Sequence, residues 1–294
     1  MANLLKGRAG TRIALKWLAI VLDTPRRVAE QLLRIEEQMR SVRRVFVITV
    51  VAAVALYAVV CGALFAFQRS LIYYPQPRSN REASTLMTVP VGTATVQVST
   101  HPHAGSAALI YFGGNAEDVS LDVPDLVGAF PSRAIHVLHY PGYGGSSGSP
   151  SQEAIFADSL ALFDRVHAEH PNIIVVGRSL GSGVAIWIAS QRRVSHLIMV
   201  TPFDSLADAA EEHYPFVPVR WLLRDKFESW RYAPQVAAPT RIIVAGDDEV
   251  VPRSSSDRLR ARFRDGIVSY VVVPKAGHNT IQDSPGYWAL LNSE

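Results

Sequence analysis

Ser179 lies in a pattern that is typical of a catalytic nucleophile. It is the centre of residues 177–181 (GRSLG), between an apolar, β-rich run at 173–176 and an apolar stretch at 180–191. A Gly-x-Ser-x-Gly turn from a strand into a helix projects the serine hydroxyl and leaves the amide of Leu180 facing a developing oxyanion. The five letters alone are weak evidence, since a glycine-rich turn with a capping serine shares them. No Gly-Lys-Ser/Thr follows, which excludes a phosphate-binding loop.

A serine nucleophile needs a base, because its hydroxyl does not ionise at neutral pH, and the base needs an orienting carboxylate. His278 follows the strand-like residues 268–273 in an Ala-Gly-His-Asn loop, where a base would stand. His213 lies among glutamates in what the sequence predicts to be a solvated helix, and His196 begins a strand. We therefore predict that His278 is the base.

The orienting acid should lie between the serine and the histidine along the chain. Asp247, Asp248 and Glu249 directly follow the apolar run 240–245. Three adjacent carboxylates at the end of a buried strand repel one another, so only one should point inward. The residues alone leave the choice among the three open.

These residues require elements to position them, and the chain supplies an alternation of strands and helices. The strand candidates are residues 93–99, 107–112, 135–140, 173–176, 197–200, 240–245 and 268–273. The helix candidates are residues 152–169, 180–191, 254–263 and a segment near the C-terminus. The later strand candidates are continuous apolar runs, as in parallel strands that are buried on both faces. The pattern predicts an α/β fold with a doubly wound, mostly parallel sheet and a site at the carboxyl ends of its strands.

Residues 45–67 are predicted to form one transmembrane helix. They include no charged residue, and 23 residues at about 1.5 Å each span the roughly 30 Å hydrocarbon core with some tilt. A cleaved signal peptide would have a shorter basic leader and a shorter apolar region. Ten Lys/Arg precede the helix, against Arg69, Arg78 and Arg81 after it. This imbalance predicts a cytoplasmic N-terminus and a catalytic domain on the opposite side, which is the periplasm in a Gram-negative bacterium.

The net charge of +3 conceals a basic tail. Residues 1–44 contain ten Lys/Arg and four Asp/Glu, whereas the remaining residues contain 19 and 22. Because the tail adjoins an apolar run, it fits membrane lipids better than nucleic acid, and no nucleic-acid partner is predicted. Residues 1–44 are predicted to be a cytoplasmic amphipathic segment, on the membrane or docked to a partner. The single cysteine excludes an intramolecular disulfide and does not decide the redox compartment. The sequence leaves the oligomeric state open.

Several segments together resemble one known family. Residues 111–116 (YFGGNA) resemble the Phe-His-Gly-Asn-Ala loop of membrane-anchored α/β-hydrolase domain proteins related to serine aminopeptidases. Residues 139–150 (HYPGYGGSSGSP) are similar to their Tyr-Arg-Gly-Tyr-Gly-x-Ser-x-Gly-x-Pro segment. Residues 177–181, 68–75 (QRSLIYYP) and 216–227 (FVPVRWLLRDKF) also match.

This resemblance, which covers roughly residues 68–285, implies the α/β-hydrolase fold and a Ser-Asp-His triad without a metal or cofactor. The fold's Asp-x-x-Val-Pro register selects Asp248 as the acid, with Ser179 as nucleophile and His278 as base. By position, the oxyanion hole is expected to use the backbone amides of Asn115 and Leu180. Gly113 departs from the family, which usually has histidine there, and puts the support of this loop in doubt.

The resemblance also implies a domain organisation and a reaction. Residues 68–294 are expected to form the hydrolase domain, with a small cap insertion at about 202–238 over an acyl pocket. The expected reaction is cleavage of an ester or thioester of a small-molecule or lipid-like acyl substrate, with an amide less favoured. Two alternatives remain: a catalytically degenerate membrane scaffold, and a different chemistry on the same fold, such as a lyase or acyltransferase.

Overall fold

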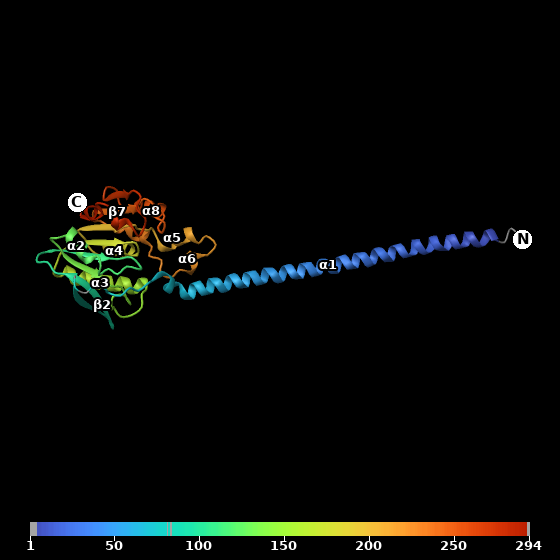
Figure 1. Cartoon of the computed structure of the whole chain (residues 1–294), viewed down its shortest axis with the longest axis horizontal. Helices are drawn as coiled ribbons and strands as arrows, with labels where there is room; N and C mark the ends of the chain where they lie inside the picture. Colours follow the sequence, from blue (N-terminus) through green and yellow to red (C-terminus); the bar gives the residue numbers. More distant parts are fainter. Residues whose placement is uncertain (1–4, 81, 83, 293–294) are drawn as a thin grey trace. The chain divides into compact units, whose positions relative to one another are not determined.

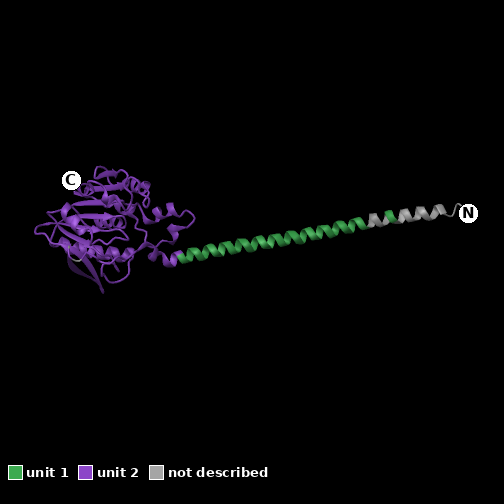
Figure 2. Ribbon diagram, in the orientation of Figure 1, with its two compact units in different colours: residues 1–63 green, residues 64–294 purple. Residues whose placement is uncertain are grey.

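The computed structural model describes residues 5–80, 82 and 84–292. It divides into two compact units, Met1–Ala63 and Leu64–Glu294 (Figure 2). The second unit contains all the predicted catalytic residues. It also contains the last residues of the predicted membrane helix.

Helix α1 extends over Leu5–Ile72, from the first unit into the start of the second (Figure 1). Within residues 5–44 the chain is therefore helical and continuous with the predicted span, with Pro25 inside the helix. Pairs four residues apart, such as Arg27 with Asp23 and Arg40 with Glu36, favour a helix in its polar part. Its Asp23–Ile72 portion includes a stretch that is long and apolar enough to cross a bilayer, and that stretch is not buried against the rest of the chain.

The second unit is built on one eight-stranded sheet, in the order β1-β2-β4-β3-β5-β6-β7-β8. The β1–β2 and β2–β4 pairs are antiparallel, and all other neighbours are parallel. The strands are β1 Thr85–Val91, β2 Ala94–His101, β3 Ala107–Phe112, β4 Ala134–Leu138, β5 Asn172–Arg178, β6 His196–Val200, β7 Thr240–Ala245 and β8 Val268–Val273. The predicted doubly wound, mostly parallel sheet is confirmed.

Helices cover both faces of this sheet. Alternate side chains of each strand point to opposite faces, so Ile110 belongs to one apolar cluster and Leu109 to another. The first cluster includes α3 (Gln152–His167), α4 (Leu180–Gln191) and α8 (Arg253–Arg260); the second includes α2 (Val123–Ala129) and α9 (Tyr287–Asn292). The short helices α5 (Leu206–His213), α6 (Val219–Leu222), α7 (Ser229–Tyr232) and η1 (Ala233–Gln235) lie between β6 and β7, and η2 (Ile281–Asp283) precedes α9.

Several elements of the domain were not predicted from the sequence, among them β1, α2, α6 and α7. Strand β1 contains Pro90, a residue that argues against a central strand but is tolerated at the edge, and β1 is an edge strand that pairs only with β2. Helix α2 has seven residues and includes Pro124 and Gly128, so it is too short for a helical period to show.

The turn after β5 depends on two glycines that let a strand and a helix approach closely. A Cβ on Gly181 would overlap the carbonyl oxygen of Phe112, at the end of β3. A Cβ on Gly177 would overlap the carbonyl oxygen of Gly181. These obstacles are backbone atoms that cannot rotate away, so the turn tolerates no side chain at either position.

Gly181→Ala should therefore destabilise the domain by about 1–3 kcal/mol or more, because the added methyl group must displace β3 from α4. The matched control is Gly128→Ala in α2, where a Cβ has no atom within 4 Å. The control should be neutral or stabilising by about 0.5–1 kcal/mol, since alanine is the better helix former. Thermal unfolding of the full chain in detergent measures both. Equal stability of the two variants would contradict the packing described here.

Candidate active site

The turn between β5 and α4 holds Ser179 in a backbone conformation that few L-residues adopt. Its φ is 49° and its ψ is −117°, and its amide donates to the carbonyl oxygen of Val200 on the neighbouring strand β6 at 2.9 Å. The serine is partly exposed although most of its sequence neighbours are buried. A strained non-glycine residue at a strand end is a recurrent feature of functional sites.

His278 stands against this serine, on the loop after β8. Its Nε2 lies 2.9 Å from the Oγ of Ser179, and the residue is only 4% exposed. Its Nδ1 lies 2.9 and 3.0 Å from the two carboxylate oxygens of Asp248. An ionised carboxylate only accepts, so Nδ1 must donate to it. In the neutral imidazole this leaves Nε2 as the acceptor for the serine hydroxyl.

Asp248, rather than either adjacent acid, meets His278. Its side chain is 2% exposed, and its Oδ1 accepts hydrogen bonds from the amides of Val250 and Val251 at 2.9 and 2.7 Å. Asp247 is exposed, and its amide donates to the carbonyl oxygen of Ala276. One strand-end carboxylate therefore points inward, as like-charge repulsion predicts.

Glu249 supports the histidine loop from the other side. Its Oε2 accepts from the amide of His278 at 3.2 Å. Glu249 therefore contacts the backbone of the histidine, whereas Asp248 contacts its ring. The structure brings Ser179, His278 and Asp248 into the hydrogen-bonded chain that the sequence predicted.

The loop after β3 passes beside the serine. A Cβ on Gly114 would lie 3.7 Å from the Cβ of Ser179. The next residue, Asn115, is held by its other groups: its carbonyl oxygen accepts from the Tyr143 hydroxyl at 2.6 Å, and its Nδ2 donates to the Ile72 carbonyl oxygen at 2.8 Å.

Two amides beside the serine remain available for an oxyanion. Leu180 is the first residue of α4, so its amide has no acceptor within the helix. Within the described residues, the amide of Asn115 likewise donates to no protein group. These are the two amides that the resemblance selects, and their role in an oxyanion hole stays a prediction.

A buried ion pair supports this loop, and the sequence did not single it out. The Nη1 of Arg178 lies 2.5 Å from Oε2 of Glu117, and both side chains are about nine-tenths buried. Oε2 also accepts from the amide of Gly114 at 2.9 Å, and Oε1 accepts from the Tyr111 hydroxyl at 2.6 Å. The Nη2 of Arg178 reaches the carbonyl oxygen of His278 at 3.4 Å. The available signal was a charged residue inside an otherwise apolar turn.

The same pair explains the departure at Gly113. A Cβ there would overlap a methyl group of Val119 and lie 2.8 Å from Oε1 of Glu117. The space into which a side chain at 113 would project is thus filled. Glu117 takes over the support of the loop, and the Tyr140 hydroxyl adds a hydrogen bond to the carbonyl oxygen of Gly113 at 2.8 Å.

The charges around the pair are strongly coupled. Burial disfavours the charged form of Arg178, but Glu117 outweighs this and the pKa of the guanidinium is raised. Burial also raises the pKa of Asp122 to about 9, and the nearby Glu117 carboxylate adds to the shift. Asp122 is therefore neutral at pH 7, so Glu117 and Arg178 form a balanced pair.

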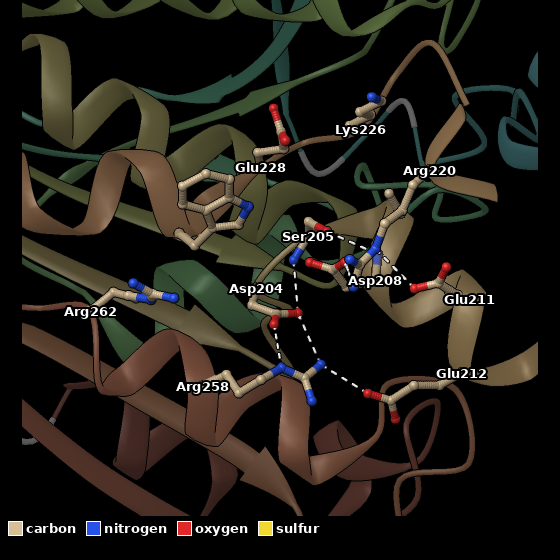
Figure 3. Close-up of a pocket in the computed structure, with 12 residues that line it drawn as sticks. Asp204, Ser205, Asp208, Glu211, Glu212, Arg220, Lys226, Glu228, Arg258 and Arg262 are labelled. Atoms are coloured by element: carbon tan, nitrogen blue, oxygen red, sulfur yellow. Dashed lines mark hydrogen bonds and ion pairs between the residues drawn. The ribbon is translucent and has the colours of Figure 1, made fainter. Parts of the chain in front are cut away.

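A separate polar cavity lies under the short helices between β6 and β7 (Figure 3). Two of its arginines are paired with acids of the same cavity: Arg258 with Asp204 and Glu212, and Arg220 with Asp208 and Glu211. None of the predicted catalytic residues lines it. Within the described part of the chain, no three His, Cys, Asp or Glu residues come together as metal ligands.

Comparisons with known proteins agree with this fold. The profile of the alpha/beta hydrolase fold matches residues 108–233. The chain is 35% identical over 258 residues to the uncharacterized protein Rv2307c of Mycobacterium tuberculosis, covering 81% of this chain and 90% of that one. It is 27% identical to lysophosphatidylserine lipase ABHD12 of Macaca fascicularis over 68% of this chain and 59% of that one.

Among solved structures, the esterase Pf2001 of Pyrococcus furiosus superposes with a TM-score of 0.59 at 16% identity, covering 73% of this chain and 95% of the esterase. At this identity the likeness shows the fold. Together with the matched profile and the relatives, it places the chain in the α/β-hydrolase superfamily, to which it belongs. The link to serine aminopeptidases stays a resemblance of motifs.

If Asp248 orients His278, Asp248→Asn should lower kcat for an ester by roughly 10²–10⁴-fold, because the imidazole loses its orienting partner and the stabilisation of its charged form. Asp247→Asn is the matched control, one residue away and exposed, and should change kcat less than about tenfold, as expected for a surface site. Steady-state hydrolysis of a short ester measures both. The opposite ranking would assign the acid to Asp247.

Proposed function

We propose that this protein is a serine hydrolase that cleaves an ester or thioester through Ser179, His278 and Asp248. The observation that supports this most directly is the unbroken hydrogen-bonded chain from the Oγ of Ser179 through the imidazole of His278 to the carboxylate of Asp248. Each link has the length and polarity that proton transfer from serine requires.

In the proposed reaction, Nε2 of His278 takes the proton as Oγ of Ser179 attacks the acyl carbon. The amides of Leu180 and Asn115 donate to the tetrahedral oxyanion, and the imidazolium then gives its proton to the departing alcohol or thiol. Water, activated by the same imidazole, hydrolyses the acyl-serine and restores the hydroxyl. No step requires a metal or cofactor.

The relatives support an acyl substrate without fixing which one. Among them are a protein named for its lysophosphatidylserine lipase activity and, by fold, an archaeal esterase. A small-molecule or lipid-like ester therefore fits best. The two alternative functions, a scaffold that has lost catalysis and another chemistry on this fold, are outcomes of the next test.

A fluorophosphonate probe should label the wild-type chain at one residue, because it phosphonylates only an activated serine. Ser179→Ala should abolish the labelling and the ester hydrolysis together. His213→Ala is the control, because the His213 ring contacts the Val250 carbonyl oxygen rather than the triad, and it should keep both. An unlabelled wild-type chain that is folded would favour the scaffold. Labelling without hydrolysis of any ester or thioester would favour another chemistry.

We further propose that α1 anchors the protein in a membrane, with residues 1–44 in the cytoplasm and the hydrolase domain on the other side. The support is the apolar stretch of α1 together with the excess of Lys/Arg before it. In a Gram-negative bacterium this side is the periplasm. Residues 1–67 would then contact membrane lipids.

The orientation can be tested with alkaline phosphatase, which is active only outside the cytoplasm, fused after Glu294. The fusion should be active, because the basic residues before the span are retained on the cytoplasmic side. The control is a reporter active only in the cytoplasm, fused at the same position, which should be inactive. The reverse result with both reporters would place the hydrolase domain in the cytoplasm.

A further inference from the structure

Two motifs that the catalytic proposal does not use meet in the structure. Gln68, the residue directly after the predicted span, donates from Nε2 to the Leu222 carbonyl oxygen at 3.1 Å. Its Oε1 accepts from the amide of Arg224 at 2.7 Å. Both contacts lie within the second unit, and Gln68 is itself buried. The end of α1 is thus bonded to the backbone of the segment after α6.

A buried carboxylate strengthens this junction. Asp225, whose side chain is 5% exposed, accepts from Arg69 Nε at 3.0 Å and from the Tyr73 hydroxyl at 3.1 Å. Burial and the adjacent Asp225 raise the pKa of the Tyr73 phenol, so it stays a neutral donor. A charged, buried acceptor with fixed donors makes this contact specific and costly to break.

Helix α6 is also fixed to its neighbour. Arg220 on α6 pairs with Asp208 and Glu211 of α5, at 2.7 and 2.9 Å, and Figure 3 shows its guanidinium turned toward them. Arg258 of α8 continues the network to Asp204 and Glu212. Although α6 has only four residues, it is therefore held from both sides.

This fixed segment presents large apolar side chains to solvent. Trp221 on α6 is 90% exposed and Phe216 just before it is 87% exposed. Beside them, the guanidinium of Arg224 lies 4.2 Å from the ring centroid of Phe65, a residue of the predicted span. Aromatic rings with this degree of exposure have a free-energy cost in water.

We propose that the segment Tyr214–Arg224 is a membrane-docking surface that inserts Trp221 and Phe216 into the lipid–water interface of the bilayer that α1 crosses. The proposal rests on the proposed anchoring by α1. It names the lipid interface as the occupant of this surface, because the segment is bonded to the first residue after the span.

Distance supports this occupant. Headgroup regions extend roughly 5–8 Å beyond the hydrocarbon on each side, about one helical turn. Gln68 and Arg69 are the first two residues after the span, so the backbone that they bind cannot be far from the headgroups. Tryptophan and other aromatic residues concentrate at this depth, and arginine extends its charge toward lipid phosphate. Arg224 and Trp221 match both preferences.

Docking would also connect the membrane to the candidate active site. The Ile72 carbonyl oxygen, at the end of α1, accepts from Nδ2 of Asn115 in the oxyanion loop. At the same end of α1, Gln68 and Arg69 bind the cap. A cap held at the interface would therefore position the site to receive acyl esters from the membrane.

The test uses the full chain with Ser179→Ala, so that lipids are not consumed, in vesicles of equal parts phosphatidylcholine and phosphatidylglycerol. One set of vesicles has acyl chains brominated near the headgroup, where bromine quenches tryptophan fluorescence. Subtracting the spectrum of Trp221→Phe isolates the emission of Trp221. Subtracting that of Trp288→Phe gives a matched control, because Trp288 packs against the core of the hydrolase domain. We expect the Trp221 component to lose most of its intensity and the Trp288 component to keep it.

The outcomes separate this proposal from the one on which it rests. If the chain fails to float with the vesicles, anchoring is wrong and docking with it. If it floats but the Trp221 component is not quenched, docking is overturned and anchoring stands. A blue-shifted but unquenched component would mean that protein, such as a second copy, covers the surface, and this also overturns the proposal.

A second measurement follows substrate access in the active chain. Phe216→Ser with Trp221→Ser should lower turnover of a long-chain ester embedded in vesicles several-fold and leave turnover of a water-soluble short ester unchanged. Leu86→Ser, on the edge strand β1 and also exposed, is the control and should change neither. Equal loss on both esters would indicate a structural defect and contradict a docking role. If the Phe216→Ser, Trp221→Ser variant keeps full turnover of both esters and only Ser179→Ala loses them, the catalytic proposal stands and docking is overturned.

Discussion

The buried ion pair between Arg178 and Glu117 joins three loops that come from distant parts of the chain. Arg178 directly precedes the candidate nucleophile, and Glu117 lies in the loop after β3. The carbonyl oxygen of His278 lies on the loop after β8. Each loop leaves the carboxyl end of a different strand, where the backbone has no further sheet partner. Removing either charge would leave the other buried and unpaired, which typically costs about 3–5 kcal/mol. The candidate nucleophile, the candidate base and the loop after β3 are therefore linked through one buried ion pair.

This constraint explains why the neighbouring groups are arranged as they are. Burial and the nearby Glu117 carboxylate raise the pKa of Asp122 to about 9, which favours the neutral form of Asp122 beside the pair. Glycine at 113 follows from the same crowding, since Val119 and Glu117 fill its side-chain space. Gly113 and Glu117 thus depend on each other, since the Glu117 carboxylate lies in the space of a side chain at 113 and accepts from the amide of Gly114.

The sequence predicted the sheet and the triad because their signals are local. Strand β5 and the glycines at 177 and 181 place Ser179 without knowledge of the rest of the chain, whereas Asp248 was selected among three adjacent acids only by the register of the family that the chain resembles. Edge strand β1 was not predicted, because Pro90 argues against a strand in any local stretch of sequence. Only the order of strands in the sheet shows why the proline is tolerated. The Glu117–Arg178 ion pair was not predicted for a different reason. Its partners are 61 residues apart, and their meeting follows from the parallel pairing of β3 with β5, which no local pattern contains.

The end of α1 is bonded to the hydrolase domain and is not a flexible linker to it. Within eight residues after the predicted span, Gln68, Arg69 and Tyr73 bind the cap, while Ile72 and Tyr74 bind the oxyanion loop at Asn115. A flexible linker would need none of these contacts, and each one fixes polar groups that would otherwise be hydrated. Together these contacts fix the distance between the candidate site and the last residue of the predicted span. On the proposed anchoring by α1, these contacts would hold the candidate site at a defined distance from the bilayer.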